Sequence, residues 1–343
     1  MLSSPTDNKA FDDTAHPLTD RFGRHVTYLR ISVTDRCDLR CIYCMSEKMQ
    51  FVPRPQLLTL EELTRVGETF VALGGSKIRI TGGEPLTRRN ILYLFESLGR
   101  LEGLKDLTLT TNGTLLPQYA QDLKAAGVTR VNISLDSLIP ERFHAMTRVG
   151  EIERTLRGID AALDAGFDKV KINSVILKDH NHDEVVNLVA FARERGLDIS
   201  FIEEMPLGYV DGHDRADAYY SSHSILKDLQ RHYELVPTTD STGGPSRYHR
   251  IIDSNTRVGF ISPHSHNFCD HCNRVRLTAE GRLLLCLGQE HSVDLRRILR
   301  ANPGDDDVLR QAIIDSMQIK PKGHEFSLQG EPVIFRHMNE TGG

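Results

Sequence analysis

The sequence predicts an α/β protein in which parallel strands alternate with helices. From Val26 onward, six runs rich in apolar and β-branched residues have the length of strands, and a helical stretch separates each run from the next. Repeated strand–helix units of this length require parallel pairing with right-handed crossovers. Their spacing leaves two architectures open, an open doubly wound sheet and a barrel.

The predicted strands and the helices between them carry distinct local signals. The strand runs have the sequences VTYLRISV, KIRITG, DLTLTT, RVNISLD, KVKINSVIL and DISFIEEM. Thr59, with Glu62 three residues later, predicts a capping box at the start of a helix, and Gly127, Gly166 and Gly196 are placed to end three other helices. These signals support the alternation of strands and helices.

The pattern changes after about Gly208. A stretch containing glycine and proline, TTDSTGGPSR, is followed by a predicted hairpin around Glu280 and Gly281 in the run RVRLTAEGRLLLC, and then by two short helical segments. The sequence therefore predicts a second structural unit.

At the N-terminal end of the chain, residues 1–19 are polar and lack periodicity, which predicts a disordered tail.

Composition and charge limit the classes of function. The 343 residues, 39% apolar and 26% charged, suffice for a large core. A net charge of −5 gives no reason to expect nucleic acid or an anionic membrane as the main partner. No apolar run approaches the roughly 18 residues of a spanning helix. The polar N-terminus lacks a secretory signal, so we expect a cytoplasmic protein.

The six cysteines form two groups of three, and in a reducing compartment they favour metal binding or catalysis over disulfides. Cys37, Cys41 and Cys44 form a CxxxCxxC motif directly after the first predicted strand. A structural zinc site needs four ligands, whereas a [4Fe–4S] cluster held by three cysteines keeps one iron free for another ligand. The alternatives are a zinc site completed by a distant residue and unrelated core cysteines.

This motif, with Tyr43 just before its third cysteine, resembles the signature of the radical SAM superfamily, in which S-adenosylmethionine (SAM) binds the free iron. A second match is Gly83 in the segment TGGEP, where glycine allows close backbone approach. The resemblance implies an incomplete (β/α)6 TIM-type barrel, whose active site lies at the C-terminal ends of the strands. It also implies four residues that contact SAM: Tyr43, Gly83, Ser134 and Met205.

The second cysteine group spans the predicted hairpin. Cys269, Cys272 and Cys286 form a CxxC motif followed by thirteen residues and one more cysteine. This spacing permits a zinc site that takes a fourth ligand from a nearby histidine, namely His264, His266 or His271.

The combination of the two cysteine groups resembles the GTP 3′,8-cyclase family, also called molybdenum cofactor biosynthesis protein A. The resemblance extends from about Asp20 to Gly343. It implies SAM and two [4Fe–4S] clusters as cofactors, and a smaller C-terminal α+β domain that closes the barrel. The implied divisions are a tail at 1–19, a partial barrel at 20–208, a domain carrying the second cluster at 209–335 and a C-terminal Gly-Gly tail at 336–343.

The resemblance also implies residues for substrate binding and catalysis. GTP carries about four negative charges, which cations and hydrogen-bond donors must balance. Arg274 and Arg276 alternate on one predicted strand and so share a face. The implied GTP-binding residues are Arg30, Arg79, Thr110, Lys171, Arg274, Val275 and Arg276. The implied catalytic residues are Cys37, Cys41, Cys44, Arg274, Arg276, Gly342 and Gly343.

The activity that the resemblance implies is the first step of molybdenum cofactor biosynthesis. A SAM-derived 5′-deoxyadenosyl radical takes hydrogen from C3′ of GTP, and C3′ then bonds to C8 of guanine. The resemblance further implies a homodimer, an electron donor and a functional link to the next enzyme of the pathway, cyclic pyranopterin monophosphate synthase. Two alternatives remain open: a radical SAM enzyme with an auxiliary cluster and a different substrate, and a zinc-binding interaction protein.

Overall fold

A curved sheet organises the part of the chain that the computed structural model describes, residues 16–329 and 334–343. Its twelve strands lie in the order β12-β11-β10-β1-β2-β3-β4-β5-β6-β9-β8-β7. The strands are β1 (Tyr28–Ser32), β2 (Lys77–Thr81), β3 (Asp106–Thr111), β4 (Arg130–Ser134), β5 (Lys169–Val175), β6 (Asp198–Ile202), β7 (Leu235–Pro237), β8 (Arg247–Ile251), β9 (Arg257–Ile261), β10 (Arg274–Leu277), β11 (Arg282–Leu284) and β12 (Ser292–Asp294). The predicted tail at 1–19 lies outside the described residues except for 16–19.

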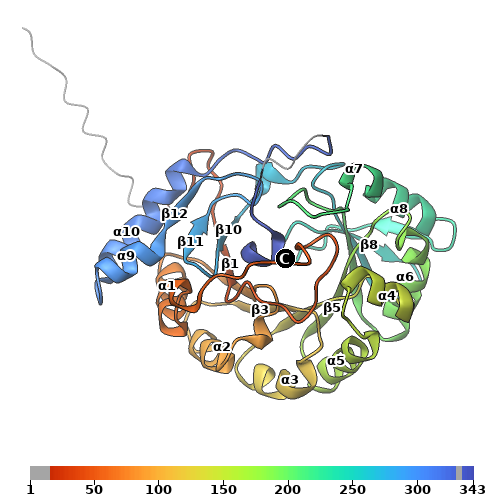
Figure 1. Cartoon of the computed structure of the whole chain (residues 1–343), viewed down its shortest axis with the longest axis horizontal. Coiled ribbons are helices and arrows are strands. Elements are labelled where there is room, and N and C mark those ends of the chain that lie inside the picture. Colours follow the sequence, from red (N-terminus) through yellow and green to blue (C-terminus); the bar gives the residue numbers. More distant parts are fainter. Residues whose placement is uncertain (1–15, 330–333) are drawn as a thin grey trace, which may run out of the picture.

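The eight central strands, from β10 through β1 to β6 and on to β9, pair in parallel. The outer strands, β11 and β12 at one edge and β8 and β7 at the other, pair antiparallel. In the described residues no hydrogen-bonded pairing joins β12 to β7, so the sheet stays open there. Figure 1 shows the sheet curling around the C-terminal end of the chain, with α1 to α6 outside it. The predicted fold class, α/β with an incomplete barrel, is confirmed.

Helices α1 to α6 cover the outer face of the sheet (Figure 1). The α-helices are α1 (Leu60–Ala72), α2 (Ile91–Gly99), α3 (Leu116–Ala125), α4 (Pro140–Thr147), α5 (Ile152–Asp164), α6 (Val185–Glu194), α7 (Arg215–Ala218), α8 (Ser222–Leu229), α9 (Leu295–Ala301), α10 (Asp306–Ser316) and α11 (Met338–Thr341). Short 3₁₀ helices lie at η1 (Arg54–Gln56), η2 (Pro85–Thr87), η3 (His182–Glu184), η4 (Cys269–His271) and η5 (Met317–Ile319).

The predicted helix signals are confirmed. Thr59 Oγ1 accepts a hydrogen bond from the backbone N–H of Glu62 at 3.1 Å, and the Glu62 carboxylate accepts one from the N–H of Thr59 at 2.8 Å. This reciprocal pair is the capping box at the start of α1. Gly127, Gly166 and Gly196 each have a positive φ just after a helix.

All six predicted strands are present as β1 to β6, and the predicted hairpin is present as β10 and β11. The sequence did not predict β9, because its five residues, RVGFI, are a short run interrupted by glycine. Strands β10 and β9 each pair with a strand of the predicted barrel that is distant in sequence. Strand β10 pairs with β1, and β9 pairs with β6. They extend the sheet of β1 to β6 on its two sides.

The strands separate an apolar outer face from a polar inner face, because successive side chains point to opposite sides of a sheet. On β1, Leu29 and Ile31 are fully buried in the core, whereas Arg30 lines an internal cavity. At the N-terminal end of β2, Lys77 Nζ pairs with Asp106 of β3 at 2.6 Å and donates to the carbonyl oxygen of Thr242 at 2.8 Å. The barrel interior is thus charged and polar.

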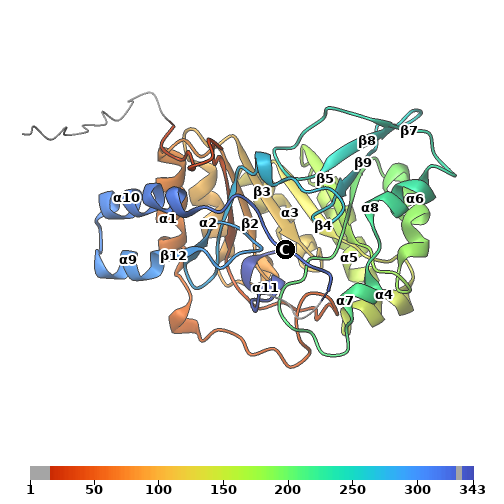
Figure 2. The same cartoon turned by 90° about the horizontal axis from the view of Figure 1, so that it is seen from above.

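The C-terminal part of the chain contributes to both ends and to the centre of the molecule. Figure 2 shows α9, α10 and β12 beside α1 at one end, and α11 with the C-terminus near the middle.

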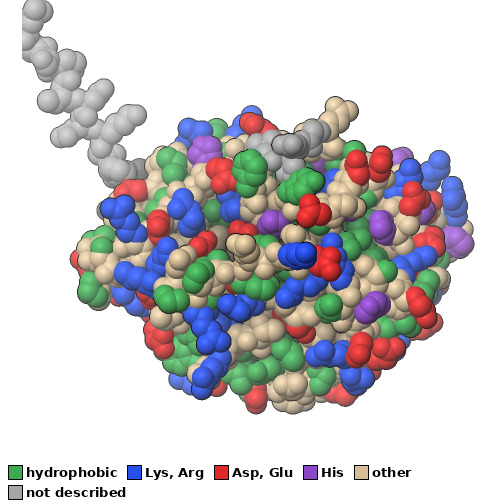
Figure 3. All heavy atoms as spheres, viewed as in Figure 1, with side chains coloured by type: hydrophobic (Ala, Val, Ile, Leu, Met, Phe, Trp, Pro, Cys, Tyr) green, Lys and Arg blue, Asp and Glu red, His purple; other side chains and the backbone are tan. Residues whose placement is uncertain are grey.

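The face in Figure 3 carries interspersed basic and acidic side chains. Among the described residues, no helix has both the length and the apolar character needed to span a membrane.

Candidate active site

A cavity at the C-terminal ends of the parallel strands brings the two cysteine groups together. Cys37, Cys41 and Cys44 line it from the loop after β1, and Cys269, Cys272 and Cys286 line it from the C-terminal part of the chain. All six are free thiols. Parallel α/β barrels build their active sites at this end of their strands. This cavity is therefore the candidate active site.

The loop that carries the first cysteine group is held against the end of α4. The backbone N–H groups of Arg40 and Ile42 donate to the carbonyl oxygens of Thr147 and Met146 at 3.0 and 2.9 Å. These bonds fix the backbone on both sides of Cys41. The loop is therefore positioned by protein contacts that do not involve the sulfur atoms.

The sulfur atoms of the first group lie in a buried environment. Burial raises the pKa of Cys37 and Cys41 well above the usual range and raises the pKa of Cys44 to about 12. Asn112 Nδ2 contacts Cys37 Sγ at 3.8 Å. Buried thiols of this kind lose their protons when a metal stabilises the thiolate.

Gly83, at the end of β2, lies against the first cysteine loop. A Cβ atom built at this position would lie 2.4 Å from the carbonyl oxygen of Arg36. The N–H of Gly83 donates to Thr34 at 2.8 Å, and the N–H of Glu84 donates to the carbonyl oxygen of Arg36 at 2.8 Å. Glycine is required here because the two backbones approach too closely for any side chain.

The buried carboxylate of Glu84 connects the ends of β2 and β3. It accepts hydrogen bonds from the N–H of Leu86 at 3.0 Å, from the N–H of Asn112 at 2.7 Å and from Thr111 Oγ1 at 2.9 Å. Burial raises the pKa of Glu84 to about 7. This carboxylate fixes the positions of Gly83 and Asn112 relative to each other.

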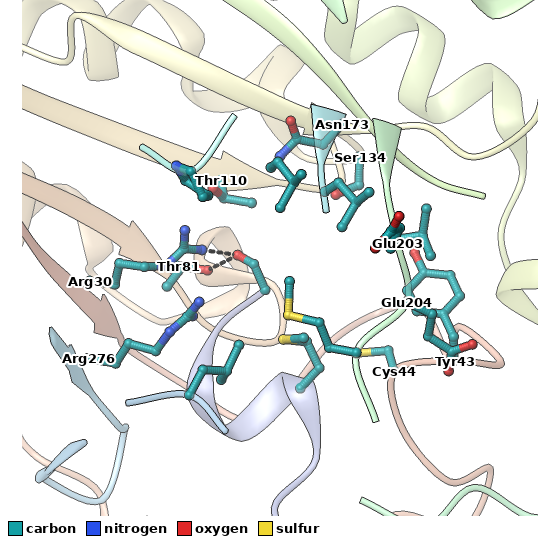
Figure 4. A pocket seen from close by; sticks show the side chains of 18 of the residues that line it. Arg30, Tyr43, Cys44, Thr81, Thr110, Ser134, Asn173, Glu203, Glu204 and Arg276 are labelled. Carbon is teal, nitrogen blue, oxygen red and sulfur yellow. Dashed lines mark hydrogen bonds between the residues drawn. The ribbon is translucent and has the colours of Figure 1, made fainter. Parts of the chain in front are cut away.

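Tyr43, Ser134 and Met205 all line the cavity. The phenol of Tyr43 donates to Asp136 Oδ2 at 2.6 Å, and Asp136 Oδ1 accepts from the N–H of Val175 at 2.8 Å. Asp136 therefore links the residue before Cys44 to the ends of β4 and β5. Figure 4 shows Tyr43 and Cys44 on the side of the cavity where Glu203 and Glu204 also lie.

Cationic side chains form the opposite side of the cavity (Figure 4). Arg276 lies beside Arg30 in the register of β10 and β1. Arg30 donates to a terminal oxygen of Gly343, and Arg276 donates to the carbonyl oxygen of Gly342. Thr81 Oγ1 also donates to Gly343, at 3.2 Å. These contacts hold the terminal Gly-Gly at the cations inside the cavity.

Most of the sequence-predicted site residues line this cavity. They are Arg30, Cys37, Cys41, Tyr43, Cys44, Gly83, Thr110, Ser134, Met205, Cys269, Cys272, Arg274, Val275, Arg276, Cys286 and Gly343. Gly342 lies against Thr81, where an added Cβ would approach the threonine side chain to 2.2 Å. Val275 is 1% exposed, with its side chain in the apolar core.

Arg79 and Lys171 do not reach the cavity lining, although both point into the barrel. Arg79 Nε donates to Tyr28 Oη at 2.6 Å, and its Nη1 donates to Thr110 Oγ1 at 3.0 Å. Lys171 Nζ contacts Ser200 Oγ at 3.2 Å and Tyr248 Oη at 3.3 Å. Arg79 lies two residues before Thr81 on β2, and Lys171 lies two residues before Asn173 on β5. Thr81 and Asn173 line the cavity, so the two cations lie in the layer of side chains beneath them.

In the second cysteine group, Cys269 lies on η4, Cys272 directly follows η4, and Cys286 lies two residues after β11. Burial raises the pKa of Cys269 and Cys286. At Cys272 burial also acts to raise the pKa, but the cations of Arg274 and Lys320 outweigh it and lower the pKa to about 7. A thiolate at this position is therefore stable near neutral pH.

The arrangement of possible metal ligands bears on whether the cysteines hold a single metal ion, such as zinc, or an iron–sulfur cluster. Among the described residues, no three His, Cys, Asp or Glu side chains are grouped so as to hold one metal ion. A [4Fe–4S] cluster does not require such a grouping, because its thiolates bind separate irons. Of the histidines near the second cysteine group, His324 lines the cavity, whereas His264, His266 and His271 do not.

Sequence reasoning missed several residues that shape the site. Glu203 accepts hydrogen bonds from the N–H groups of Ser222, His264 and Ser265 at 2.8, 3.0 and 3.1 Å, which fixes the start of the loop leading to η4. Glu204 binds His213 and Arg215 at 2.8 and 3.0 Å. Asn112, Asp136, Glu203 and Glu204 all follow strand ends, so the rule that barrel sites form there could have found them. Lys320 and Arg24 also lie near the site, but neither follows a strand end, so this rule could not have found them.

Comparison with known proteins first defines the class. Residues 31–192 match the model of the Radical SAM superfamily, and residues 197–326 match the model described as Molybdenum Cofactor Synthesis C. The crystal structure of Streptococcus suis SuiB bound to S-adenosylmethionine has a similar fold, with a TM-score of 0.61 and 15% identity over 92% of this chain and 77% of that one. The fold and the site thus define a protein of the radical SAM superfamily.

Three bacterial enzymes are similar along nearly the whole chain. The GTP 3′,8-cyclase of Marinobacter nauticus is 58% identical over 95% of this chain and 98% of its own length. Those of Saccharophagus degradans and Pseudomonas entomophila are 56% and 58% identical, with the same coverage of 95% and 98%. The chain belongs to the GTP 3′,8-cyclase family.

Proposed function

We propose that this protein is a GTP 3′,8-cyclase that catalyses the first step of molybdenum cofactor biosynthesis. Its product is (8S)-3′,8-cyclo-7,8-dihydroguanosine 5′-triphosphate. The observation that carries the proposal is a single cavity lined by two cysteine groups and by arginines. This cavity occurs in a chain that is 58% identical to a named GTP 3′,8-cyclase.

Cys37, Cys41 and Cys44 hold the first [4Fe–4S] cluster. They fit this role because three free thiols line one cavity and the backbone at Gly83 packs directly against the loop that carries them. When bound there and given one electron from a donor, the cluster and SAM would supply a 5′-deoxyadenosyl radical, and C3′ of GTP would lose its hydrogen to that radical. Tyr43, Gly83, Ser134 and Met205 bind SAM, and Asp136 orients Tyr43.

Cys269, Cys272 and Cys286 would hold a second [4Fe–4S] cluster, which would offer an iron without a cysteine ligand to the guanine base. This assignment is supported by their place in the same cavity and by the lowered pKa of Cys272. The main contribution of the protein to the C3′–C8 bond is to hold sugar and base in one orientation between the two cysteine groups.

The arginines bind the triphosphate. Arg30, Arg274 and Arg276 line the cavity and offer donors that match phosphate oxygens. Thr110 and the backbone at Val275 complete this set, while Arg79 orients Thr110 through their 3.0 Å hydrogen bond and Lys171 adds positive charge from the layer below. Gly342 and Gly343 contact the same arginines and take part in turnover there.

The finer organisation is part of the proposal. We assign residues 20–208 to the radical SAM barrel, 209–335 to the domain with the second cluster and 336–343 to the functional tail. The enzyme acts as a homodimer in the cytoplasm, receives electrons from a separate donor and supplies cyclic pyranopterin monophosphate synthase. Six free thiols are consistent with a reducing compartment.

Serine substitutions in the two cysteine groups test the division of roles. Anaerobically reconstituted protein is expected to contain about eight irons per chain and to convert GTP while consuming SAM. Cys286→Ser should still cleave SAM but form no cyclised nucleotide, because the first group is intact. Cys41→Ser should lose both reactions.

Chromatography of 5′-deoxyadenosine and of the nucleotide product measures both reactions in one sample. Product formation by Cys286→Ser would contradict the role of the second group. Unmodified protein that cleaves SAM but leaves GTP unchanged would contradict the substrate assignment.

A further inference from the structure

Lys320, just after η5, is a buried lysine that the reaction described above does not use. Lys320 is only 1% exposed to solvent. Its Nζ donates to the carbonyl oxygen of Arg274 at 2.9 Å and to that of Leu285 at 2.5 Å. The same nitrogen lies 3.9 Å from Cys272 Sγ, within reach of an N–H···S hydrogen bond.

The acceptors of Lys320 frame the second cysteine group. Arg274 follows Cys272 by two residues, and Leu285 directly precedes Cys286. One ammonium therefore joins the start of β10 to the end of β11, and these are the two segments that carry Cys272 and Cys286. This bridge adds to the antiparallel pairing of β10 with β11, which also joins the two segments.

Arg24 extends the bridge to the third cysteine. Its Nη1 donates to the carbonyl oxygen of Cys269 at 2.8 Å, and its Nη2 donates to that of Pro321 at 2.6 Å. Arg24 is itself held by Asp20 at 2.6 Å. The short segment at Lys320 and Pro321 is thus attached to the backbone beside all three cysteines.

Within the described residues, no carboxylate lies within hydrogen-bond distance of the Lys320 ammonium. In residues 16–329 and 334–343, its hydrogen-bond acceptors are two carbonyl oxygens and one sulfur. A buried cation is costly unless an anion compensates it. The potential anion that Lys320 contacts is Cys272 of the second cysteine group, whose thiolates would keep a net negative charge around a [4Fe–4S] core.

We propose that Lys320 is a positioning residue for the second cluster, and that it also raises the reduction potential of that cluster. It does so by fixing the segments of Cys272 and Cys286, by donating to Cys272 Sγ and by placing a cation beside the cluster. Hydrogen bonds to sulfur and nearby positive charge both favour the reduced state of an iron–sulfur cluster. This inference rests on the second cluster of the proposed function.

The test uses full-length protein that can bind iron at the second group alone. A parent protein with Cys37→Ser, Cys41→Ser and Cys44→Ser is reconstituted anaerobically, with and without Lys320→Met, which removes the donors and keeps the length. Lys322→Met, an exposed lysine two residues further on, is the matched control. The readouts are iron per chain and the midpoint potential followed by electron paramagnetic resonance.

The expected result for Lys320→Met is either loss of iron or a reduction equilibrium constant about tenfold lower, which is about 59 mV for one electron. Lys322→Met should match the parent in both readouts. Equal iron content and equal potential in Lys320→Met and Lys322→Met would overturn the inference. A parent protein that binds no iron would instead refute the second cluster, which separates the two failures.

Lys320→Arg distinguishes loss of the cation from general damage. If Lys320→Met fails to fold, as judged by circular dichroism, Lys320→Arg and Lys320→Gln are compared in its place. Retention of the parent potential in Lys320→Arg and a lowered potential or lost iron in Lys320→Gln support the inference. The parent potential in both variants overturns it.

Discussion

At the scale of single residues, the two cysteine groups differ in what surrounds their sulfur atoms. Burial raises the pKa of Cys37, Cys41 and Cys44, whereas cations bring the pKa of Cys272 down to about 7. The first group thus depends on its metal for deprotonation, and the second has one thiolate stabilised by the protein. Arg274, one of these cations, also lines the cavity at the proposed triphosphate site.

Replacing Arg274 with alanine is expected to weaken GTP binding by about 10- to 100-fold, because a hydrogen bond to a charged group contributes about 1.5–3 kcal/mol. Arg274 lines the cavity, and its guanidinium carbon lies 4.9 Å from the centre of the Phe268 ring. Equilibrium dialysis of reconstituted protein with GTP measures the Kd. Arg282→Ala, an exposed position on the next strand, is the control; equal Kd values for the two variants would exclude a role of Arg274 in binding.

At the scale of elements, the site depends on loops that follow parallel strands and are fixed to one another by backbone contacts. The loop after β1 and the segment after β2 exchange hydrogen bonds at Gly83 and Glu84. Glu84 then joins the segment after β2 to the one after β3. The first cysteine loop is therefore placed by its neighbours along the sheet.

Gly83→Ala is expected to reduce SAM cleavage on the order of 10²-fold, the cost of a misplacement of about 1 Å at a reacting centre. The added Cβ would lie 2.4 Å from the carbonyl oxygen of Arg36, which is backbone and cannot rotate away. The rate of 5′-deoxyadenosine formation provides the measurement. Gly244→Ala is the control, since its Cβ would meet nothing closer than 3.7 Å. Unchanged cleavage by Gly83→Ala would show that the close approach is not needed.

At the scale of the whole molecule, the sequence predicted the barrel strands and the two cysteine groups because periodicity and motif spacing are local signals. It could not predict that β10 would pair with β1, since Arg276 and Arg30 become neighbours through a contact 246 residues apart. The layer in which Arg79 and Lys171 lie depends on the register between neighbouring strands of the barrel. Lys320 and Arg24 belong to segments without a motif, and their roles appear once the chain is folded.

The architecture as a whole requires one substrate to reach both cysteine groups. The cavity that both groups line is the common feature on which the cyclase assignment depends. In the proposed function, the substrate presents its sugar to one group while its base faces the other. A measurement that follows the sugar hydrogen therefore tests this arrangement directly.

The most direct test is the transfer of deuterium from GTP labelled at C3′ to 5′-deoxyadenosine. Reconstituted protein with SAM and a reductant is expected to yield deuterated 5′-deoxyadenosine together with the cyclised nucleotide, as measured by mass spectrometry. If SAM is cleaved, the 5′-deoxyadenosine carries no deuterium and the GTP is recovered unchanged, the sugar is not placed before the radical and the account is contradicted.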